Sequence, residues 1–159
     1  MTPQWQIAAN PRGVTRLALR RGARLGSHSS IANSNDARAR AEQQLRDYFA
    51  GRLVSFSVAC DISELSPFTR KVLRTAAKIP YGQVRSYQWL AERLGKPKAC
   101  RAVGNALARN PVPILIPCHR VVRRDGGIGR FVLGSGWKKR LLELEKRFAK
   151  TEASSNNPA

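Results

Sequence analysis

Residues 110–122 read NPVPILIPCHRVV, and the pair Cys118-His119 lies there between two apolar runs. A thiol becomes a nucleophile when a neighbouring group stabilises the thiolate, which His119 could do directly or through a water. A carboxylate that orients the imidazole would complete a triad, and spacing alone leaves Glu143 and Glu145 as candidates. Since adjacent residues usually point in different directions, the pair taken alone favours a buried, inert cysteine, so the surrounding sequence has to decide.

The segment before this stretch predicts a helix-turn-helix. Ser66 is expected to cap a first helix, with Pro67 at its first position. A second helix is expected after Ser86 as far as Leu94, and a third from about Pro97 to Arg109. The connection between the second and third helices is short and contains glycine, as in helix-turn-helix units.

The third predicted helix is thin and basic. Its small residues are Ala99, Ala102, Gly104, Ala106 and Ala108, and its cations are Lys96, Lys98, Arg101 and Arg109. An alanine-rich helix is often an ordinary core helix, but the charge on the same segment favours one that approaches a nucleic-acid groove closely.

The N-terminal residues 1–62 predict a small α+β lobe. We expect strands on either side of a turn at 11–13, a helix over 36–50, and a half-buried strand over 54–58 that ends at Cys60. His28 lies in a polar, serine-rich loop and is expected to be solvated.

Residues 63–148 are expected to form a second, C-terminal domain. Its last helix is predicted over 136–148, where apolar residues recur at helical spacing. The polar residues 149–159 are expected to be a flexible tail. The whole chain is therefore predicted to be an α+β protein.

Charge and cysteine usage narrow the class of function. Twenty-nine Lys and Arg oppose ten Asp and Glu, a net charge of +19, which favours a nucleic-acid partner over an anionic membrane or an acidic protein. No apolar run is long enough to span a membrane, and no signal peptide is recognised. Three cysteines without a CxxC pair, together with two histidines, favour a reducing cytoplasm and predict no metal site.

Several segments together resemble one family of DNA-repair proteins. Residues 101–106 (RAVGNA) and 110–122 closely resemble the active-site region of O6-alkylguanine-DNA alkyltransferases. Residues 80–84 (PYGQV), the pair Ser86-Tyr87, and Lys138 followed by Leu141, Leu142 and Glu145 are also similar to that family. The resemblance is specific over residues 66–146 and weak over residues 1–60.

The resemblance implies an α+β fold with a ribonuclease H-like N-terminal lobe and a C-terminal winged helix-turn-helix domain. It implies single-turnover transfer of the O6-alkyl group of a flipped guanine to Cys118, which consumes the protein. The implied catalytic residues are Cys118, His119 acting through a water, Glu145 as the third triad member, and Tyr87, which assists departure of the guanine. The expected DNA-binding residues are Arg101, which fills the stack, with Ala102, Lys98, Arg109 and Arg120. The expected structural and pocket residues are Asn110, Pro113, Val132, Leu133 and Lys138.

By resemblance, the partner is double-stranded DNA containing O6-alkylguanine, bound through the minor groove without a metal or organic cofactor. We expect a monomer, with cooperative binding along DNA left open. Residues 130–134 read RFVLG and are bulkier than in many relatives, so Val132 and Leu133 are expected to narrow the alkyl pocket. Two rivals are a winged-helix DNA-binding regulator, which leaves the triad unused, and a cysteine hydrolase, which leaves the basic helix unused.

Overall fold

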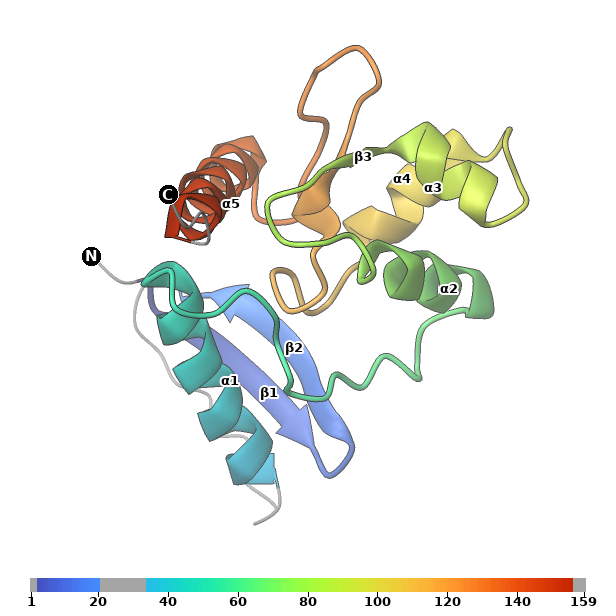
Figure 1. The fold of residues 1–159 in the computed structure, drawn as a ribbon. Helices are drawn as coiled ribbons and strands as arrows, with labels where there is room; N and C mark the ends of the chain where they lie inside the picture. The colour runs from blue at the N-terminus through green and yellow to red at the C-terminus, as the bar shows by residue number, and fades with distance from the viewer. Residues whose placement is uncertain (1–2, 21–33, 156–159) are drawn as a thin grey trace. The chain divides into compact units, whose positions relative to one another are not determined.

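The structure is a computed structural model that describes residues 3–20 and 34–155, with side chains from 36 to 151 in the second range (Figure 1). Helices and short strands confirm the predicted α+β class. The chain divides into two compact units, Met1–Glu64 with Pro111–Leu115, and Leu65–Asn110 with Ile116–Ala159. The predicted loop with His28 lies outside the described residues.

Unit 1 is built on a β-hairpin. Strands β1 (Trp5–Asn10) and β2 (Gly13–Leu19) are antiparallel and are joined by the predicted turn. Asn10 Oδ1 accepts hydrogen bonds from the backbone N–H of Arg12 and Gly13, at 2.8 and 3.1 Å, which fixes this turn. A Cβ on Gly13 would lie 2.4 Å from the Ala59 carbonyl oxygen, so only glycine fits there.

Helix α1 (Ser34–Phe49) packs on this hairpin. The apolar spacing of its sequence explains the contact, because it places one side of the helix in the core. The buried residues of the hairpin and the helix are Ile7, Val14, Leu17, Ala41, Leu45 and Tyr48.

The strand predicted over residues 54–58 is wrong. These residues form no ladder, and only an isolated bridge joins Val14 to Cys60. The reason is local: Gln44 Oε1 on α1 accepts the backbone N–H groups of Ser57 and Val58 at 3.0 and 3.2 Å. The side chain of Gln44 thus accepts the hydrogen bonds that, in a sheet, the carbonyl groups of a neighbouring strand would accept.

Unit 2 contains the predicted helices in the predicted order. Helix α2 (Pro67–Ala76) begins after Ser66, whose hydroxyl accepts the Thr69 N–H, and helix α3 (Tyr87–Arg93) begins after Ser86, which caps it in the same way. Helix α4 (Cys100–Ala108) starts later than expected, because the Ala99 N–H bonds the Lys96 carbonyl in a turn. Their packed faces contribute Val72, Leu73, Ala76, Leu90, Ala91, Val103, Ala106 and Leu107.

A short parallel ladder positions the site. Strand β3 (Arg85–Ser86) pairs with β4 (Val121–Val122), and the 3-10 turn η1 (Cys118–Arg120) comes just before β4. Since α3 starts directly after β3, the ladder brings the start of α3 close to η1.

Helix α5 runs over Ser135–Ser155, beyond the predicted end at Phe148. The expected flexible tail is therefore helical through residue 155, and residues 156–159 lie outside the described part. Residues 149–157 contain no glycine or proline, so no helix-breaking residue stops α5 at Phe148.

Candidate active site

The turn η1 holds the candidate nucleophile inside unit 2. Cys118 is 4% exposed, and its neighbour His119 is fully buried. Asn110 Nδ2 donates to the Ile116 carbonyl at 3.0 Å and lies 3.1 Å from Cys118 Sγ. One amide therefore fixes the backbone before the turn and also contacts the thiol.

His119 is oriented by a carboxylate from α5. Its Nε2 lies 2.7 Å from Glu145 Oε1, and both side chains are buried. Glu143, the alternative that spacing left open, is exposed. The geometry therefore selects Glu145 as the partner of the imidazole.

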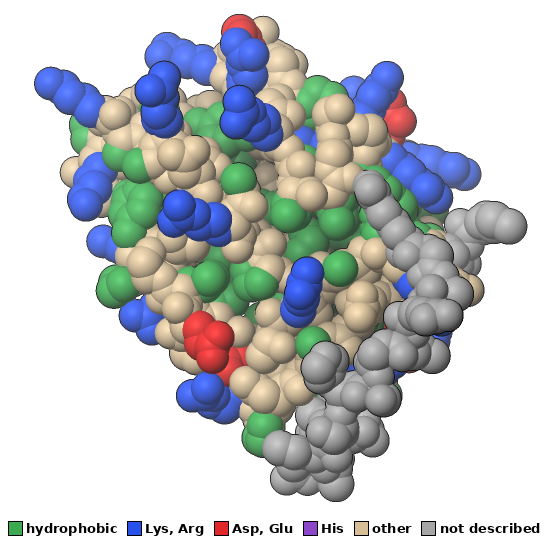
Figure 2. Space-filling model, turned by 180° about the vertical axis from the view of Figure 1, so that it is seen from behind, with side chains coloured by type: hydrophobic (Ala, Val, Ile, Leu, Met, Phe, Trp, Pro, Cys, Tyr) green, Lys and Arg blue, Asp and Glu red, His purple; other side chains and the backbone are tan. Residues whose placement is uncertain are grey.

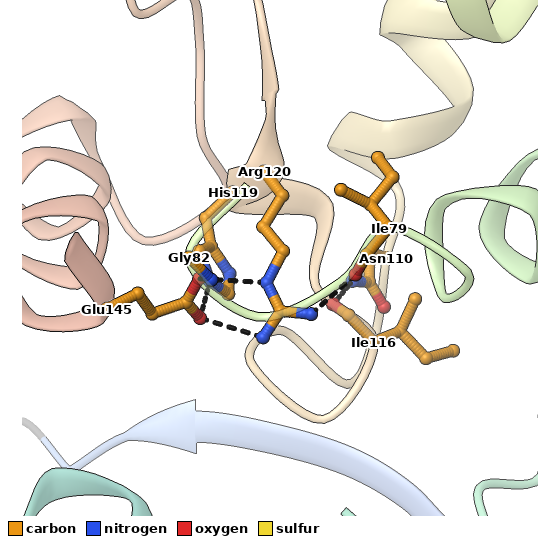
Figure 3. Close-up of polar contacts among 7 residues, drawn as sticks. All are labelled: Ile79, Gly82, Asn110, Ile116, His119, Arg120 and Glu145. Carbon is orange, nitrogen blue, oxygen red and sulfur yellow. Dashed lines mark hydrogen bonds and ion pairs between the residues drawn. The ribbon is translucent and has the colours of Figure 1, made fainter. Parts of the chain in front are cut away.

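Arg120 holds the same carboxylate from the other side (Figure 3). Its Nε donates to Glu145 Oε2 and its second terminal nitrogen to Oε1, both at 2.9 Å. Its remaining terminal nitrogen donates to the Ile79 carbonyl at 2.7 Å, and the Gly82 N–H reaches Glu145 Oε2 at 3.2 Å. Glu145 on α5 thus binds donors from two separate segments of unit 2, namely η1 and the turn that contains Gly82.

These contacts set the charge state of the network. Burial alone would raise the pKa of Glu145, but hydrogen bonds from His119 and Arg120 outweigh it and lower the pKa from 4.5 to about 2. Burial lowers the pKa of His119, although Glu145 opposes that shift. Glu145 is therefore an anion beside a neutral imidazole. With Nε2–H donated to the carboxylate, Nδ1 is the basic nitrogen.

His119 Nδ1 is buried and has no hydrogen-bond partner among the described residues. Burial raises the pKa of the Cys118 thiol to about 11, which the Asn110 hydrogen bond and the charge of Lys138 counteract in part. Cys118 is therefore a thiol at neutral pH. It needs a base when it reacts, and Nδ1 is the available lone pair of the triad.

Tyr87 and Lys138 form a second polar group beside the cysteine. Lys138 is fully buried, and its Nζ donates to the Val121 carbonyl at 2.6 Å, to the Arg130 carbonyl at 3.2 Å and to the Tyr87 hydroxyl at 3.5 Å. Burial lowers the pKa of Lys138 to about 8 and raises the pKa of Tyr87. A Cβ on Gly129 would lie 2.6 Å from the Tyr87 hydroxyl oxygen, so this close approach needs glycine.

Cys118 and Tyr87 line one cavity of about 750 Å³, a size that suits a small-molecule or base-sized ligand. Its walls come from α3, α4, η1 and the segment 123–132. The lining residues are Tyr87, Cys100, Arg101, Gly104, Asn105, Leu107, Ala108, Cys118, Arg123, Arg130, Phe131 and Val132.

Helix α4 presents a thin outer face next to this cavity. Val103, Ala106 and Leu107 are buried, while the exposed side carries Arg101, Ala102, Asn105, Ala108 and Arg109. Lys98 is exposed just before the helix. Small and basic residues therefore share the exposed side, which allows a polyanion to come close.

Arg120 and Leu133 differ from the sequence-based assignment, and Pro113, predicted as a structural or pocket residue, fits only the structural alternative. Arg120 is buried and bound to Glu145, so its guanidinium is not on a DNA-facing surface. Val132 lines the cavity but Leu133 does not, because the Gly134 N–H bonds the Phe131 carbonyl and the chain turns between them. Pro113 is buried in the segment assigned to unit 1 and is not a lining residue.

Sequence reasoning missed the contributions of Gly82, Ile79 and Gly129. Two of these act through the backbone, which no side-chain pattern reveals. Arg120 follows His119 directly in the sequence, and this position was a usable signal for an ion pair. A cation next to a buried triad needs a carboxylate partner.

Comparisons with known proteins agree with this geometry. The family model described as "6-O-methylguanine DNA methyltransferase, DNA binding domain" matches residues 67–147. A methylated-DNA–protein-cysteine methyltransferase of Mycobacterium leprae is 45% identical over 70% of this chain and 67% of its own. One from Methanosarcina barkeri is 37% identical over 88% of this chain and 89% of its own.

Solved structures give the same result. The crystal structure of Mycobacterium tuberculosis OGT in complex with DNA has a TM-score of 0.76 and 35% identity, covering 91% of this chain and 87% of that one. An O6-methylguanine DNA methyltransferase from Methanococcus jannaschii has a TM-score of 0.68 and 27% identity, covering 92% and 90%. Among the described residues, no helix has the length and apolar character needed to cross a membrane.

Proposed function

The chain belongs to the 6-O-methylguanine DNA methyltransferase family, and we propose that it repairs DNA by moving an alkyl group from O6 of guanine to Cys118 Sγ. One observation carries this assignment. A buried thiol lies beside a His119–Glu145 pair and opens into a cavity shared with Tyr87 and Arg101. The arrangement supplies a nucleophile, a base and room for an extruded nucleotide.

The reaction starts from the neutral thiol. His119 Nδ1 takes the thiol proton through a bridging water, and Glu145 stabilises the imidazolium that forms. The partnerless Nδ1 and the raised pKa of Cys118 support this order of events. Sγ then bonds to the alkyl carbon as the carbon–O6 bond breaks, and the electron pair of that bond stays on the guanine.

Tyr87 balances the charge on the leaving base. Its hydroxyl gives a proton to the guanine, which leaves as a neutral base, while Lys138 Nζ, 3.5 Å from that hydroxyl, stabilises the phenolate. Cys118 loses one proton to His119, and the guanine gains one proton from Tyr87, so the protons balance over the reaction. The product thioether resists hydrolysis, so each molecule reacts once, and no cofactor takes part in any step.

Access to the damaged base requires its extrusion from the stack. Flipping a nucleotide costs a few kcal/mol, which a side chain inserted into the gap offsets in part. Arg101 is exposed on α4 and lines the cavity, which supports this role for it. The exposed small residues of α4 favour an approach through the minor groove, with Ala102, Lys98 and Arg109 beside the backbone.

The finer features of the fold belong to the same proposal. We assign α2, α3 and α4 with the β3–β4 ladder to a winged helix-turn-helix domain, and the hairpin with α1 to a ribonuclease H-like lobe. The boundary is placed near residue 62. All three cysteines of the chain are free, which supports work in a reducing cytoplasm. We propose a monomer, with cooperative assembly along DNA as the alternative.

One experiment separates this function from its rivals. The protein is incubated with an excess of duplex DNA that carries O6-methylguanine with a labelled methyl group. We expect label on the protein at one equivalent and unmodified guanine in the DNA. Binding without transfer would indicate a DNA-binding regulator instead, and repeated turnover of an ester substrate would indicate a cysteine hydrolase.

A further inference from the structure

Unit 2 carries a second hollow, formed by α2 and α3 and separate from the cavity at Cys118. Its volume is about 810 Å³. We call it the α2–α3 groove, and its lining residues are Pro67, Arg70, Lys71, Arg74, Thr75, Lys78, Trp89 and Arg93. It shares no residue with the cavity that contains Cys118.

The groove is strongly basic, and no acidic residue of its lining neutralises its positive charge. Five of its lining residues are Lys or Arg, and none is Asp or Glu. Among the described residues, no carboxylate forms an ion pair with any of the five. Like charges gathered at this density destabilise one another, so the groove favours a bound polyanion.

The spacing along α2 makes a continuous basic stripe. Residues 67, 70, 71, 74, 75 and 78 recur at intervals of three and four, so they lie on one side of the helix, opposite buried Val72 and Leu73. Four helical residues rise by about 6 Å, which separates Arg70 from Arg74. Phosphates of one DNA strand recur about every 3.4 Å along the duplex axis, so cations about 6 Å apart can meet phosphates about two steps apart on one backbone.

Trp89 forms the α3 side of the groove and holds cations in place. The Arg93 guanidinium carbon lies 4.9 Å and that of Arg85 5.6 Å from the centroid of the Trp89 rings. Stacking uses the flat face of a guanidinium and leaves its N–H donors, which lie in the plane, able to bind phosphate oxygens. Arg93, which lines the groove, therefore offers ordered donors, whereas Arg85 lies outside the lining and donates to the Val84 carbonyl and to Gln83 Oε1.

The groove and the exposed face of α4 are different surfaces. Helix α4 packs against both α2 and α3, its buried residues are Val103, Ala106 and Leu107, and its exposed side carries Arg101 and Ala102. The groove lies on the exposed sides of α2 and α3, away from that packed interface. Lys and Arg side chains are also widely spread over the face drawn in Figure 2, where few Asp and Glu are seen.

We propose that the α2–α3 groove binds the phosphate backbone of a second DNA segment, apart from the duplex whose alkylated guanine enters the cavity at Cys118. This proposal rests on the proposed function only in taking DNA as the natural partner. Contact with a neighbouring segment lets the protein pass between segments while it searches for rare lesions. A membrane is the weaker candidate, because interfacial binding also needs a large apolar face, and the groove offers one half-buried tryptophan.

The test compares two variants with the same loss of charge. Lys71→Gln/Lys78→Gln removes two exposed groove cations, and Lys139→Gln/Lys146→Gln removes two exposed lysines at the same spacing on α5. Affinity for undamaged DNA is measured against salt concentration, with a duplex of about 12 bp, little more than one helical turn, and with a long duplex. Methyl transfer from the short duplex and the thermal unfolding midpoint are measured alongside, as separate readouts of the reaction and of the fold.

We expect the groove variant to lower the salt slope on long DNA by about 1.8, which is 0.9 for each lost phosphate contact. Its slope on the short duplex and its transfer should match the parent, and the α5 variant should match the parent on the long duplex as well. An equal loss with the α5 variant, an equal loss on the short duplex, or no loss on either DNA would each overturn the proposal. Failure of transfer in the parent would count against the proposed function and leave this result intact.

Discussion

The pair Arg120–Glu145 controls the charge of the site at the scale of single residues. The guanidinium neutralises the carboxylate inside the protein, so the imidazole of His119 stays neutral until it accepts a proton. A buried ion pair tolerates the loss of neither partner, since the remaining charge is left without compensation. Arg120 is thus a positioning residue that acts through Glu145.

Replacing Arg120 by Gln should lower the free energy of unfolding by about 3–5 kcal/mol, as expected when a buried pair loses one partner. The matched control is Arg123→Gln, because Arg123 pairs with Asp125 at 2.8 Å with both side chains exposed. That change should cost less than about 1 kcal/mol. Urea unfolding of both variants measures the difference, and equal costs would show that the Arg120 clamp does not stabilise the fold.

The lowered pKa of Glu145 predicts a pH dependence of stability. The carboxylate is bound by His119 and Arg120 in the folded state. Its contribution to the free energy of unfolding is therefore full above pH 4.5 and is lost as the pH falls to about 2. The gap in unfolding free energy between the parent and Glu145→Gln should therefore shrink over that window.

The control for this prediction is Glu143→Gln, since Glu143 lies on the same helix but is exposed. The difference in unfolding free energy between Glu143→Gln and the parent should stay small and constant over the same pH range. Transfer should slow strongly for Glu145→Gln and little for Glu143→Gln. A stability gap for Glu145→Gln that stays constant from pH 5 to pH 2 would contradict the bound carboxylate.

The sequence predicted that His119 and Glu145 would meet, which the structure shows, and it failed where residue identity does not report burial. Cys118, His119 and Glu145 follow from a motif and a resemblance, and the structure brings the three together. Arg120 was predicted to be a DNA-binding residue, and its identity alone carries no information on its burial. Only the fold shows that its guanidinium points inward, to Glu145 and to the Ile79 carbonyl.

At the scale of elements, we expect α4 to act in the extrusion of the damaged base and not in the chemical step. Arg101 lies in the first turn of α4 and lines the cavity, whereas Arg109 follows the last residue of the helix and is not a lining residue; both are exposed. Arg101→Ala should slow repair of a duplex about tenfold or more relative to reaction with a free modified base, because the free base needs no extrusion. Arg109→Ala should weaken duplex binding without this selective effect.

The measurement is the transfer rate of each variant with both substrates. A loss for Arg101→Ala that is equal on duplex and free base would place Arg101 in the chemistry or in folding. The same selective loss in Arg109→Ala would show that charge on α4, and not the position of Arg101, is responsible.

The segment 130–134 is expected to set the substrate range. Val132 lines the cavity and is 44% exposed, whereas Leu133 is not a lining residue. We expect good methyl transfer and poor inactivation of the parent by free O6-benzylguanine, whose ring needs a slot of its own. Val132→Gly should raise the benzyl rate, by about tenfold if relief of overpacking is worth 1–2 kcal/mol.

Leu133→Gly is the matched control, and it should leave the benzyl rate near that of the parent. Both variants should transfer methyl groups normally. Fast inactivation of the parent by the benzylated base would refute the narrow pocket, and a gain confined to Leu133→Gly would assign the wall to the other residue.

Capping residues and apolar periodicity predicted the helices well. The errors lie where a side chain competes with a neighbouring strand for backbone hydrogen bonds, or where polar residues continue a helix. Ser66 and Ser86 cap α2 and α3 as expected from their sequence. Residues 54–58 alternate like a strand, but Gln44 takes their N–H groups, and no local pattern reveals a partner 13 residues away. The end of α5 was placed too early because polarity was taken for disorder.

At the scale of the whole molecule, net charge and architecture serve the same partner. The charge of +19 favours rapid, salt-dependent association with DNA at any sequence. The division into two units could not be predicted in detail, because residues 111–115 group with the N-terminal unit although they lie between segments of the other. Such a long-range exchange is decided by tertiary contacts, which sequence periodicity does not encode.

The most direct test of the account asks which atom receives the alkyl group. The parent and Cys118→Ala are incubated with a duplex containing O6-methylguanine, and the peptides of each are mapped by mass spectrometry. The account predicts that the parent gains one methyl group on Cys118 and none on Cys60 or Cys100, while Cys118→Ala still binds the duplex and gains none. Methylation of Cys60 or Cys100 at a comparable rate, or transfer by Cys118→Ala, would contradict it.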